Sequence, residues 1–320
     1  MENILSLEHV QTGFKRHKDV FYALSDVSFT MQRGETLGIV GESGSGKSVT
    51  ALSIMGLLGK NGQVLSGHIL FNGQDLIRAS SREMQEIRGN KISMIFQEPM
   101  TALNPVLKIS YQMREVIRLH LHKGTKEADE IARHMLEQVG IKNVSETLAG
   151  YPHTLSGGMR QRVMIAMALV CHPEILIADE PTTALDVTIQ HQICELMKEL
   201  RTQYGTAIML ITHDLGVVAE MCDRVIVMYA GQIVEEADVF SLFRNTLHPY
   251  TKALMRSIPY LDMSDGDRLE AIGGMVPANY PVMPGCRFAN RCSLADERCR
   301  RECPSLVEKD GCHRVRCWKA

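Results

Sequence analysis

A glycine-rich loop between a strand pattern and a helix pattern is the feature that most constrains this chain. Residues 41–48 read GESGSGKS and fit the pattern G-x-x-x-x-G-K-[ST]. An apolar run at residues 36–40 precedes the loop, and a segment with helical periodicity follows it. Glycines let successive backbone N–H groups surround an anion, and the helix N-terminus adds its positive end. The pattern therefore predicts a nucleotide phosphate site in an α/β fold.

Two side chains at the end of this loop have the chemistry that a nucleotide site needs. Lys47 can reach the β- and γ-phosphates, and the Ser48 hydroxyl is a ligand type for Mg²⁺. The residues expected to contact the nucleotide are Gly41, Ser43, Gly44, Ser45, Gly46, Lys47, Ser48 and Val49.

The body of the chain predicts a parallel sheet covered by helices. Apolar runs typical of buried strands lie at residues 36–40, 92–96, 174–178, 207–212 and 225–229. Apolar residues recur at helical spacing in residues 125–139 and 187–203. Strands alternating with helices favour parallel pairing. Residues 98–158 have helical patterns and little strand pattern, which predicts a helical insertion.

The N-terminal region has a different periodicity. Apolar and polar residues alternate at residues 4–10 and again at 27–31, as in strands with one buried face. Charged residues at 15–19 lie between the two segments and predict a turn. We therefore expect an antiparallel β subdomain at the start of the chain.

Polar side chains follow three of the predicted buried strands. Asp179 and Glu180 come after residues 174–178, Gln97 ends the run at 92–96, and His213 follows 207–212. Ligands bind at the carboxyl ends of strands in open α/β sheets. Asp179, with Ser48 and Gln97, is expected to hold Mg²⁺, whereas Glu180 is expected to polarise an attacking water. His213 is expected to lie near the γ-phosphate.

Composition excludes several classes of protein. The 320 residues include 35 basic and 37 acidic side chains, a balance that makes nucleic acid an unexpected partner. No apolar window is long enough to span a membrane, and the first residues lack the features of a secretory signal. Six of the nine cysteines lie after residue 285. In a reducing cytoplasm, such clustered thiols favour metal ligation over disulfides.

Residues 155–161, LSGGMRQ, resemble the signature motif of the ABC-type ATPases. The phosphate loop, Gln97, the signature, Asp179–Glu180, residues 184–186 and His213 follow one another in the order of that family over residues 1–240. The resemblance implies an ABC-type ATPase fold and a head-to-tail pair of domains with ATP between them. It implies that the partner's ATP is contacted by Ser156, Gly157 and Gly158.

The same resemblance implies roles for four further side chains. Asp186 would line the interface of the pair, Glu180 would be the catalytic base, and His213 would be the switch histidine. Phe14 matches the aromatic residue that stacks on adenine, with Tyr22 as the alternative.

Finer similarity favours one branch of the family. Its motifs are at residues 39–49, 95–100, 182–187 and 248–254, which resemble the dipeptide and oligopeptide importer ATPases. This resemblance implies peptide cargo, a second ABC ATPase, two permeases, an extracytoplasmic binding protein and a peripheral location on the cytoplasmic membrane face. The alternatives are an importer of nickel or glutathione, a soluble single-cassette ATPase of the cluster-assembly type, and a redox sensor that binds ATP without turnover.

A change in composition after residue 259 divides the chain. Gly, Pro, Cys and Arg become frequent, and long periodic segments end. We expect an ATPase domain at residues 1–245, with its helical subdomain at about 98–158, and a C-terminal cysteine-rich extension at 246–320.

The cysteines of this extension resemble a pattern that holds a [4Fe–4S] cluster in the same branch. The expected ligands are Cys286, Cys292, Cys299 and Cys317. Four thiolates suit such a cluster and also suit tetrahedral zinc. Cys303 and Cys312 are additional candidates, and six reduced thiols without metal are the remaining alternative.

Overall fold

The computed structural model describes residues 2–16, 19–97, 102–183, 185–257, 272–277, 280, 283–311 and 313–320. The chain forms two compact units. Unit 1 comprises Met1–Glu2, Gln32–Glu35 and Arg78–Leu210, and unit 2 comprises Asn3–Met31, Thr36–Ile77 and Ile211–Ala320. These units do not test the expected boundary at residue 245. Some predicted features lie partly or wholly outside the described residues. They are the turn at 15–19, the start of the helical insertion at residue 98, Ala184, the composition change after residue 259, and Cys312.

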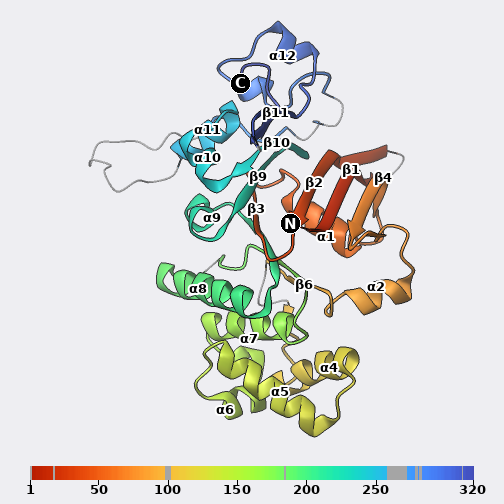
Figure 1. The fold of residues 1–320 in the computed structure, drawn as a ribbon, viewed down its shortest axis with the longest axis vertical. Coiled ribbons are helices and arrows are strands. Elements are labelled where there is room, and N and C mark those ends of the chain that lie inside the picture. Colours follow the sequence, from red (N-terminus) through yellow and green to blue (C-terminus); the bar gives the residue numbers. More distant parts are fainter. Residues whose placement is uncertain are drawn as a thin grey trace. The chain divides into compact units, whose positions relative to one another are not determined.

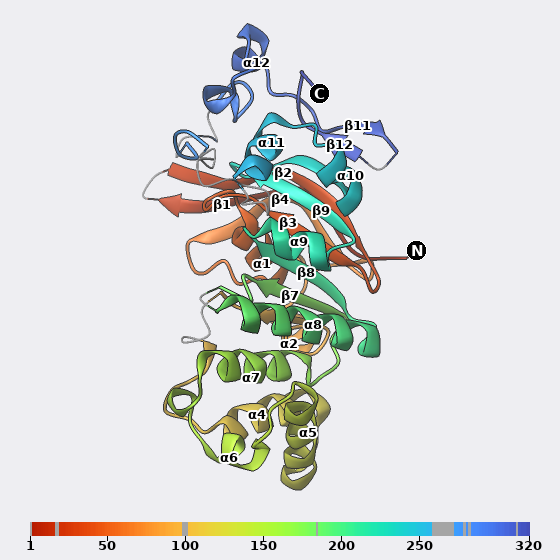
Figure 2. The ribbon, with the colours of Figure 1, turned by 90° about the vertical axis from the view of Figure 1, so that its left-hand side faces the viewer.

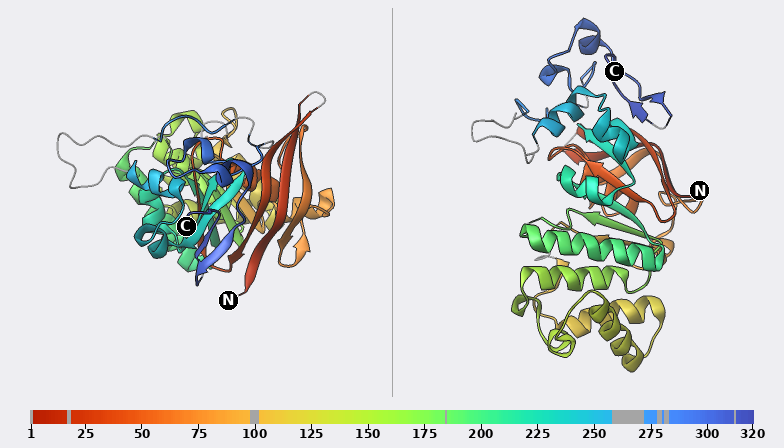
Figure 3. Two further views of the ribbon diagram at one scale, coloured as in Figure 1. Left: turned by 90° about the horizontal axis from the view of Figure 1, so that it is seen from above. Right: turned by 60° about the vertical axis from the view of Figure 1, so that its left-hand side comes forward.

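Unit 2 begins with a sheet of four strands, in the order β2-β1-β4-β5 (Figure 1; Figure 3, left). The strands are β1 (Asn3–Arg16), β2 (Asp19–Gln32), β4 (Gly62–Phe71) and β5 (Gln74–Asp75). β4 runs antiparallel to β1 and to β5. Alternate residues of β1, such as Leu5 and Leu7, are buried, so the predicted N-terminal antiparallel subdomain is confirmed.

The second sheet includes the strand that precedes the phosphate loop. Its strands in unit 2 are β3 (Thr36–Val40), β9 (Arg224–Tyr229), β10 (Gln232–Asp238), β11 (Val307–Asp310) and β12 (His313–Val315). β3 and β9 are parallel neighbours, and β10 and β12 continue the sheet in antiparallel fashion. The sequence predicted β3 and β9, whereas β10 and β12 were not predicted. The last strands of the chain therefore join the sheet that begins before the phosphate loop.

The helices of unit 2 are short. They are α1 (Lys47–Met55), α9 (Leu215–Met221), α10 (Val239–Arg244), α11 (Pro249–Arg256) and α12 (Glu297–Arg301), with a 3₁₀ turn at Ala289–Arg291. His248 caps α11, because its Nδ1 accepts the N–H of Tyr250 at 3.0 Å. Both side chains are buried.

Unit 1 combines parallel strands with a helical layer (Figure 2). β6 (Ile92–Ile95) pairs in parallel with β7 (Ile175–Asp179), and β8 (Ala207–Thr212), which enters unit 2 at Ile211, is the next strand. The helices are α2 (Ser81–Ile87), α4 (Ile109–Leu121), α5 (Thr125–Gln138), α6 (Val144–Ala149), α7 (Gly157–Leu169) and α8 (Val187–Tyr204).

The apolar runs form the core because they are buried on both faces. Every residue of β3, β7 and β8 is buried. This burial explains why apolar residues run continuously along these strands and do not alternate with polar ones. α5 and α8 match the predicted helices at 125–139 and 187–203. Among the described residues, no helix combines the length and the apolar character needed to cross a membrane.

Candidate functional site

The phosphate loop joins β3 to α1 in unit 2, as predicted. All three of its glycines have backbone angles that other residues rarely adopt. Gly41 has φ 150°, Gly44 has φ 79° and Gly46 has φ 107°. A side chain at Gly41 would place its Cβ 2.2 Å from the carbonyl oxygen of Met228 on β9. The loop therefore passes against the neighbouring strand only because Gly41 carries no side chain.

Lys47 is held by the backbone of the loop that it ends. Its Nζ donates to the carbonyl oxygens of Gly41, at 2.6 Å, and Glu42, at 3.1 Å. Lys47 as a whole residue is 6% exposed. Ser45 is also buried, and its Oγ has no hydrogen-bond partner within the described residues. The loop thus presents a buried ammonium group and a buried hydroxyl, both of which suit a phosphate oxygen.

The predicted catalytic carboxylate, Glu180, lies in a cluster of polar side chains in unit 1. Oε2 of Glu180 accepts hydrogen bonds from Nε2 of Gln97, at 3.0 Å, and from Oγ1 of Thr183, at 2.8 Å. The Glu180 backbone has φ 49°, an uncommon angle for a residue with a side chain. Asp179, the preceding residue, is buried. The structure thus brings Gln97 and Glu180 together, and Thr183 is a contact that the sequence did not reveal.

The signature residues begin a helix, and Asp186 begins another. Ser156 caps α7 by accepting the N–H of Met159 at 3.3 Å, and Gly157 and Gly158 form its first turn. Asp186 caps α8 by accepting the N–H of Ile189 at 3.0 Å. Ser156, Gly157 and Asp186 are exposed. The N-termini of α7 and α8 are therefore exposed to solvent, as binding of an anion or of a second ATPase domain would require.

The remaining predicted residues lie in unit 2. His213 directly follows β8 and is exposed, whereas Phe14 and Tyr22 are half-buried on β1 and β2. A Cβ at Gly46 would lie 3.3 Å from the carbonyl oxygen of Ala23, the neighbour of Tyr22. Phe14 instead lies opposite Gly62 on β4. The carbonyl oxygen of Ala23 therefore lies near the phosphate loop, and Phe14 stays the predicted adenine-stacking residue, with Tyr22 as the alternative.

The structure shows a group at the phosphate loop that the sequence did not predict. Both terminal guanidinium nitrogens of Arg291 donate to the Glu42 carboxylate, at 2.7 and 3.0 Å. The Glu42 N–H donates to the hydroxyl oxygen of Tyr250 at 2.8 Å. The hydrogen bonds that Arg291 donates to the Glu42 carboxylate raise the pKa of Arg291 further above its already high value. The only sequence signal was the motif at 248–254, which resembled a family segment without revealing a role.

Four cysteines converge on one cavity in unit 2. Cys286, Cys292, Cys299 and Cys317 line it, together with His248, Phe288 and Trp318. Burial raises the pKa of the Cys286 thiol to about 11 and raises that of Cys292. Backbone N–H groups point to the sulfurs, and the N–H of Lys319 lies 3.3 Å from the Cys317 sulfur. A cavity lined by four cysteine sulfurs, with amide donors beside them, has the chemistry that a thiolate-bound metal group needs, because metal binding is what deprotonates buried thiols.

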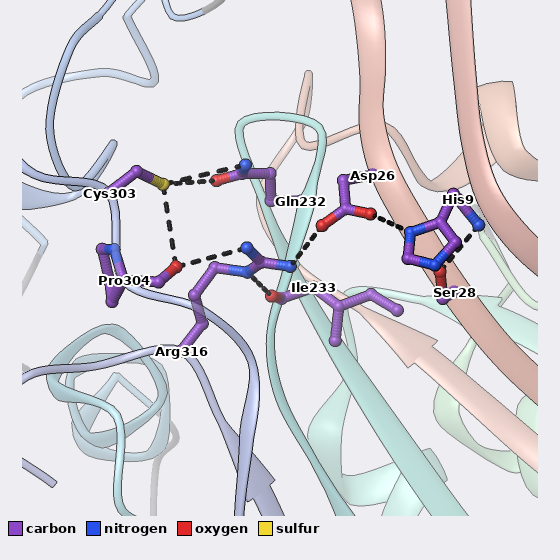
Figure 4. Close-up of polar contacts among 8 residues, drawn as sticks. All are labelled: His9, Asp26, Ser28, Gln232, Ile233, Cys303, Pro304 and Arg316. Carbon is purple, nitrogen blue, oxygen red and sulfur yellow. Dashed lines mark hydrogen bonds and ion pairs between the residues drawn. The ribbon is translucent and has the colours of Figure 1, made fainter. Parts of the chain in front are cut away.

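Cys303 does not line this cavity. Its sulfur faces the side-chain amide of Gln232 and the carbonyl oxygen of Pro304 (Figure 4). Beside it, Arg316 contacts the carbonyl oxygens of Ile233, at 2.9 Å, and Pro304, at 3.2 Å. These contacts fasten the end of the chain to β10.

Comparison with known families agrees with the motifs. The ABC transporter family model matches residues 24–183. A second model, the oligopeptide/dipeptide transporter C-terminal region, matches residues 234–299. The chain is thus similar to one family across its nucleotide motifs and to a more specific family across its C-terminal part.

Curated relatives match over nearly the full length. The oligopeptide transport ATP-binding protein AppD of Bacillus subtilis is 51% identical over 99% of this chain and 97% of its own. The dipeptide transport ATP-binding protein DppD of Escherichia coli is 47% identical over 95% and 92%. The similarity thus extends over nearly the whole of this chain and of both relatives.

Solved structures have the same fold. The ATP-binding cassette MJ0796, in a dimeric post-hydrolysis state bound to ADP and Pi, is 30% identical, with a TM-score of 0.66 over 73% of this chain and 98% of its own. CbiO1 from Clostridium perfringens is 28% identical, with a TM-score of 0.65 over 77% and 92%. The predicted family is therefore confirmed: this chain belongs to the ABC transporter ATPases, in the oligopeptide/dipeptide transporter family.

Proposed function

We propose that this ATPase powers the uptake of dipeptides or oligopeptides through partner permeases. The observation that carries the proposal is full-length similarity to ATP-binding proteins of oligopeptide and dipeptide transport, including the transporter-specific C-terminal region. Generic cassettes such as MJ0796 match only 73% of the chain. The part beyond the common cassette thus points to peptide transport.

ATP binding is assigned to the phosphate loop of unit 2, and the roles of Gln97, Asp179 and Glu180 are those that the family resemblance implies. The loop amides and Lys47 bind the β- and γ-phosphates, and Tyr22 or Phe14 stacks on adenine. Ser48, Gln97 and Asp179 are the proposed Mg²⁺ ligands, and the ion would neutralise charge on the phosphates. Hydroxyl, amide and carboxylate oxygens are the ligands that Mg²⁺ prefers, so these residues fit the ion.

Hydrolysis requires a water aligned with the γ-phosphorus. Glu180 accepts a proton from this water as the new P–O bond forms and the bond to ADP breaks, giving ADP and phosphate. Gln97, hydrogen-bonded to Glu180, orients the carboxylate, and His213 contacts the γ-phosphate. Ser156, Gly157 and Gly158 contact the ATP of a second ATPase subunit, and Asp186 lies at that interface. ATP thereby closes the pair, and its cleavage lets the pair reopen.

The proposed assembly contains this chain, a second ABC ATPase, two permeases and an extracytoplasmic binding protein. The chain would lie on the cytoplasmic face of the membrane, and its helical subdomain would bind a permease. Closure of the ATPase pair would move that subdomain and, with it, the permease.

The cysteine cavity is proposed to hold a [4Fe–4S] cluster on Cys286, Cys292, Cys299 and Cys317. Such a cluster would supply a rigid cross-link among segments of the C-terminal extension. The four sulfurs at one cavity and the amide N–H groups directed at them support this assignment over six free thiols. Zinc on the same thiolates is the competing outcome.

Reconstitution tests the transport proposal. We would assemble the chain with its second ATPase and permeases in vesicles and measure ATP hydrolysis with binding protein loaded with dipeptide, oligopeptide, nickel or glutathione. We expect peptide to stimulate hydrolysis and to enter the vesicles. Stimulation by nickel or glutathione alone would contradict peptide transport, and failure to assemble with permeases would favour a soluble ATPase.

A further inference from the structure

An arginine near the end of the chain is paired with the phosphate loop. Arg291 precedes the cavity residue Cys292, and its guanidinium makes two bonds with the carboxylate of Glu42. The Arg291 side chain is 6% exposed and that of Glu42 is 28% exposed. A bidentate pair removed from water in this way is stronger and more directional than a surface ion pair.

Arg291 is itself fixed from several sides. It donates to the carbonyl oxygens of Gly273, at 2.8 Å, and Ile272, at 3.2 Å. Its guanidinium lies 5.7 Å from the ring centre of Tyr229 and 5.9 Å from that of Phe288. Because the guanidinium is held before any ligand arrives, little side-chain entropy is lost when it restrains Glu42.

Glu42 passes this restraint to the lysine of the loop. Its carbonyl oxygen accepts from Lys47 Nζ, and its N–H donates to the buried Tyr250 hydroxyl. The carboxylate, the N–H and the carbonyl of one loop residue are therefore all bonded. Two of the three partners, Arg291 and Tyr250, come from the C-terminal part of the chain.

The charge of Glu42 makes this pairing relevant to nucleotide binding. An unpaired carboxylate in a loop that binds a triphosphate would repel its ligand, and partial burial would leave that repulsion only weakly screened. We propose that Arg291 is a positioning residue for the ATPase reaction, which fixes Glu42 and neutralises its charge so that the phosphate loop accepts MgATP. This inference rests on the proposed assignment of residues 41–48 to ATP.

A double-mutant cycle on the full chain tests the inference. MgATP affinity would be measured by calorimetry for Arg291→Gln, Glu42→Gln and the double variant. We expect Arg291→Gln to weaken binding on the order of tenfold, because it leaves the Glu42 charge unpaired. Glu42→Gln should have a smaller effect, and adding it to Arg291→Gln should restore most of the affinity.

Two controls separate charge from folding. Arg301→Gln removes an Arg–Glu pair on α12, where Arg301 lies 3.2 Å from Glu297, and should leave affinity unchanged. In steady-state turnover, Arg291→Gln should raise KM for ATP and leave kcat nearly unchanged.

The same measurements can overturn the inference. Wild-type affinity in Arg291→Gln, or a double variant as weak as Arg291→Gln alone, would show that the charge of Glu42 is irrelevant to the loop. Lys47→Ala separates this failure from failure of the ATP site. If Lys47→Ala loses MgATP affinity while Arg291→Gln keeps it, the site stands and the role of Arg291 falls.

Discussion

The phosphate loop and the cysteine cavity both belong to unit 2 but are built differently. The loop takes its residues from one continuous stretch, 41–48, between a strand and a helix. The cavity takes its lining from segments between His248 and Lys319, joined by a short helix and a 3₁₀ turn. The loop therefore owes its shape to local backbone angles, whereas the cavity depends on contacts that bring distant cysteines together.

The largest expected effect concerns the predicted catalytic carboxylate, Glu180. Glu180→Gln keeps the size of the side chain but removes its basicity. We expect turnover to fall by about a hundredfold or more, as for loss of a general base, with ATP binding retained. Phosphate release and equilibrium binding would be measured on the same preparation. Undiminished turnover would contradict the role assigned to Glu180.

The cysteine cavity should respond to single substitutions in a residue-specific way. Cys292→Ser removes a cavity thiolate, so iron and acid-labile sulfide should fall from about four of each per chain to background. Cys303→Ser, outside the cavity, is the matched control and should keep both. Iron and sulfide content and visible absorption of the anaerobically purified proteins show whether each variant holds the cluster. Stoichiometric zinc without sulfide in the wild type would refute the cluster.

A smaller effect tests how the C-terminal part supports the loop. Tyr250→Phe removes the hydroxyl that accepts the Glu42 N–H. Loss of one hydrogen bond should weaken MgATP binding by about two- to tenfold. Tyr204→Phe is the control, because Tyr204 donates to Gln138 in unit 1. Equal affinities in both variants would mean that Tyr250 does not act on the loop.

The smallest effect tests a purely local element. Ser80 caps α2, and the Glu83 carboxylate accepts the Ser80 N–H at 2.7 Å. Ser80→Ala should lower the free energy of unfolding by about 1 kcal/mol, with ATP affinity unchanged. Chemical denaturation measures the change, and Ser81→Ala is the neighbouring control. A larger loss in the control would argue against the capping box.

The sequence revealed what is encoded locally. The loop, the buried strands β3, β7 and β8, and the helices α5 and α8 have short-range patterns, and the structure places each within a few residues of its predicted range. Motifs of adjacent residues such as Asp179–Glu180 could also be recognised in the sequence, because they directly follow the apolar run of a buried strand.

The parts that were missed depend on pairing between distant residues. β10 and β12 join through Glu235–Val315 and Glu236–Arg314, and no local pattern reveals a partner so far along the chain. Arg291 is similar, because nothing near it in sequence indicates that it meets Glu42. The four cavity cysteines were predicted from family resemblance, since their spacing alone did not select them over Cys303.

One measurement tests the central claim most directly, namely that the phosphate loop holds the ATP that this chain hydrolyses. Affinity for MgATP and the rate of phosphate release would be compared between the wild-type chain and Lys47→Ala. The account predicts that the variant loses both, because Lys47 supplies the charge for the β- and γ-phosphates. Unchanged affinity and unchanged release in Lys47→Ala would contradict it.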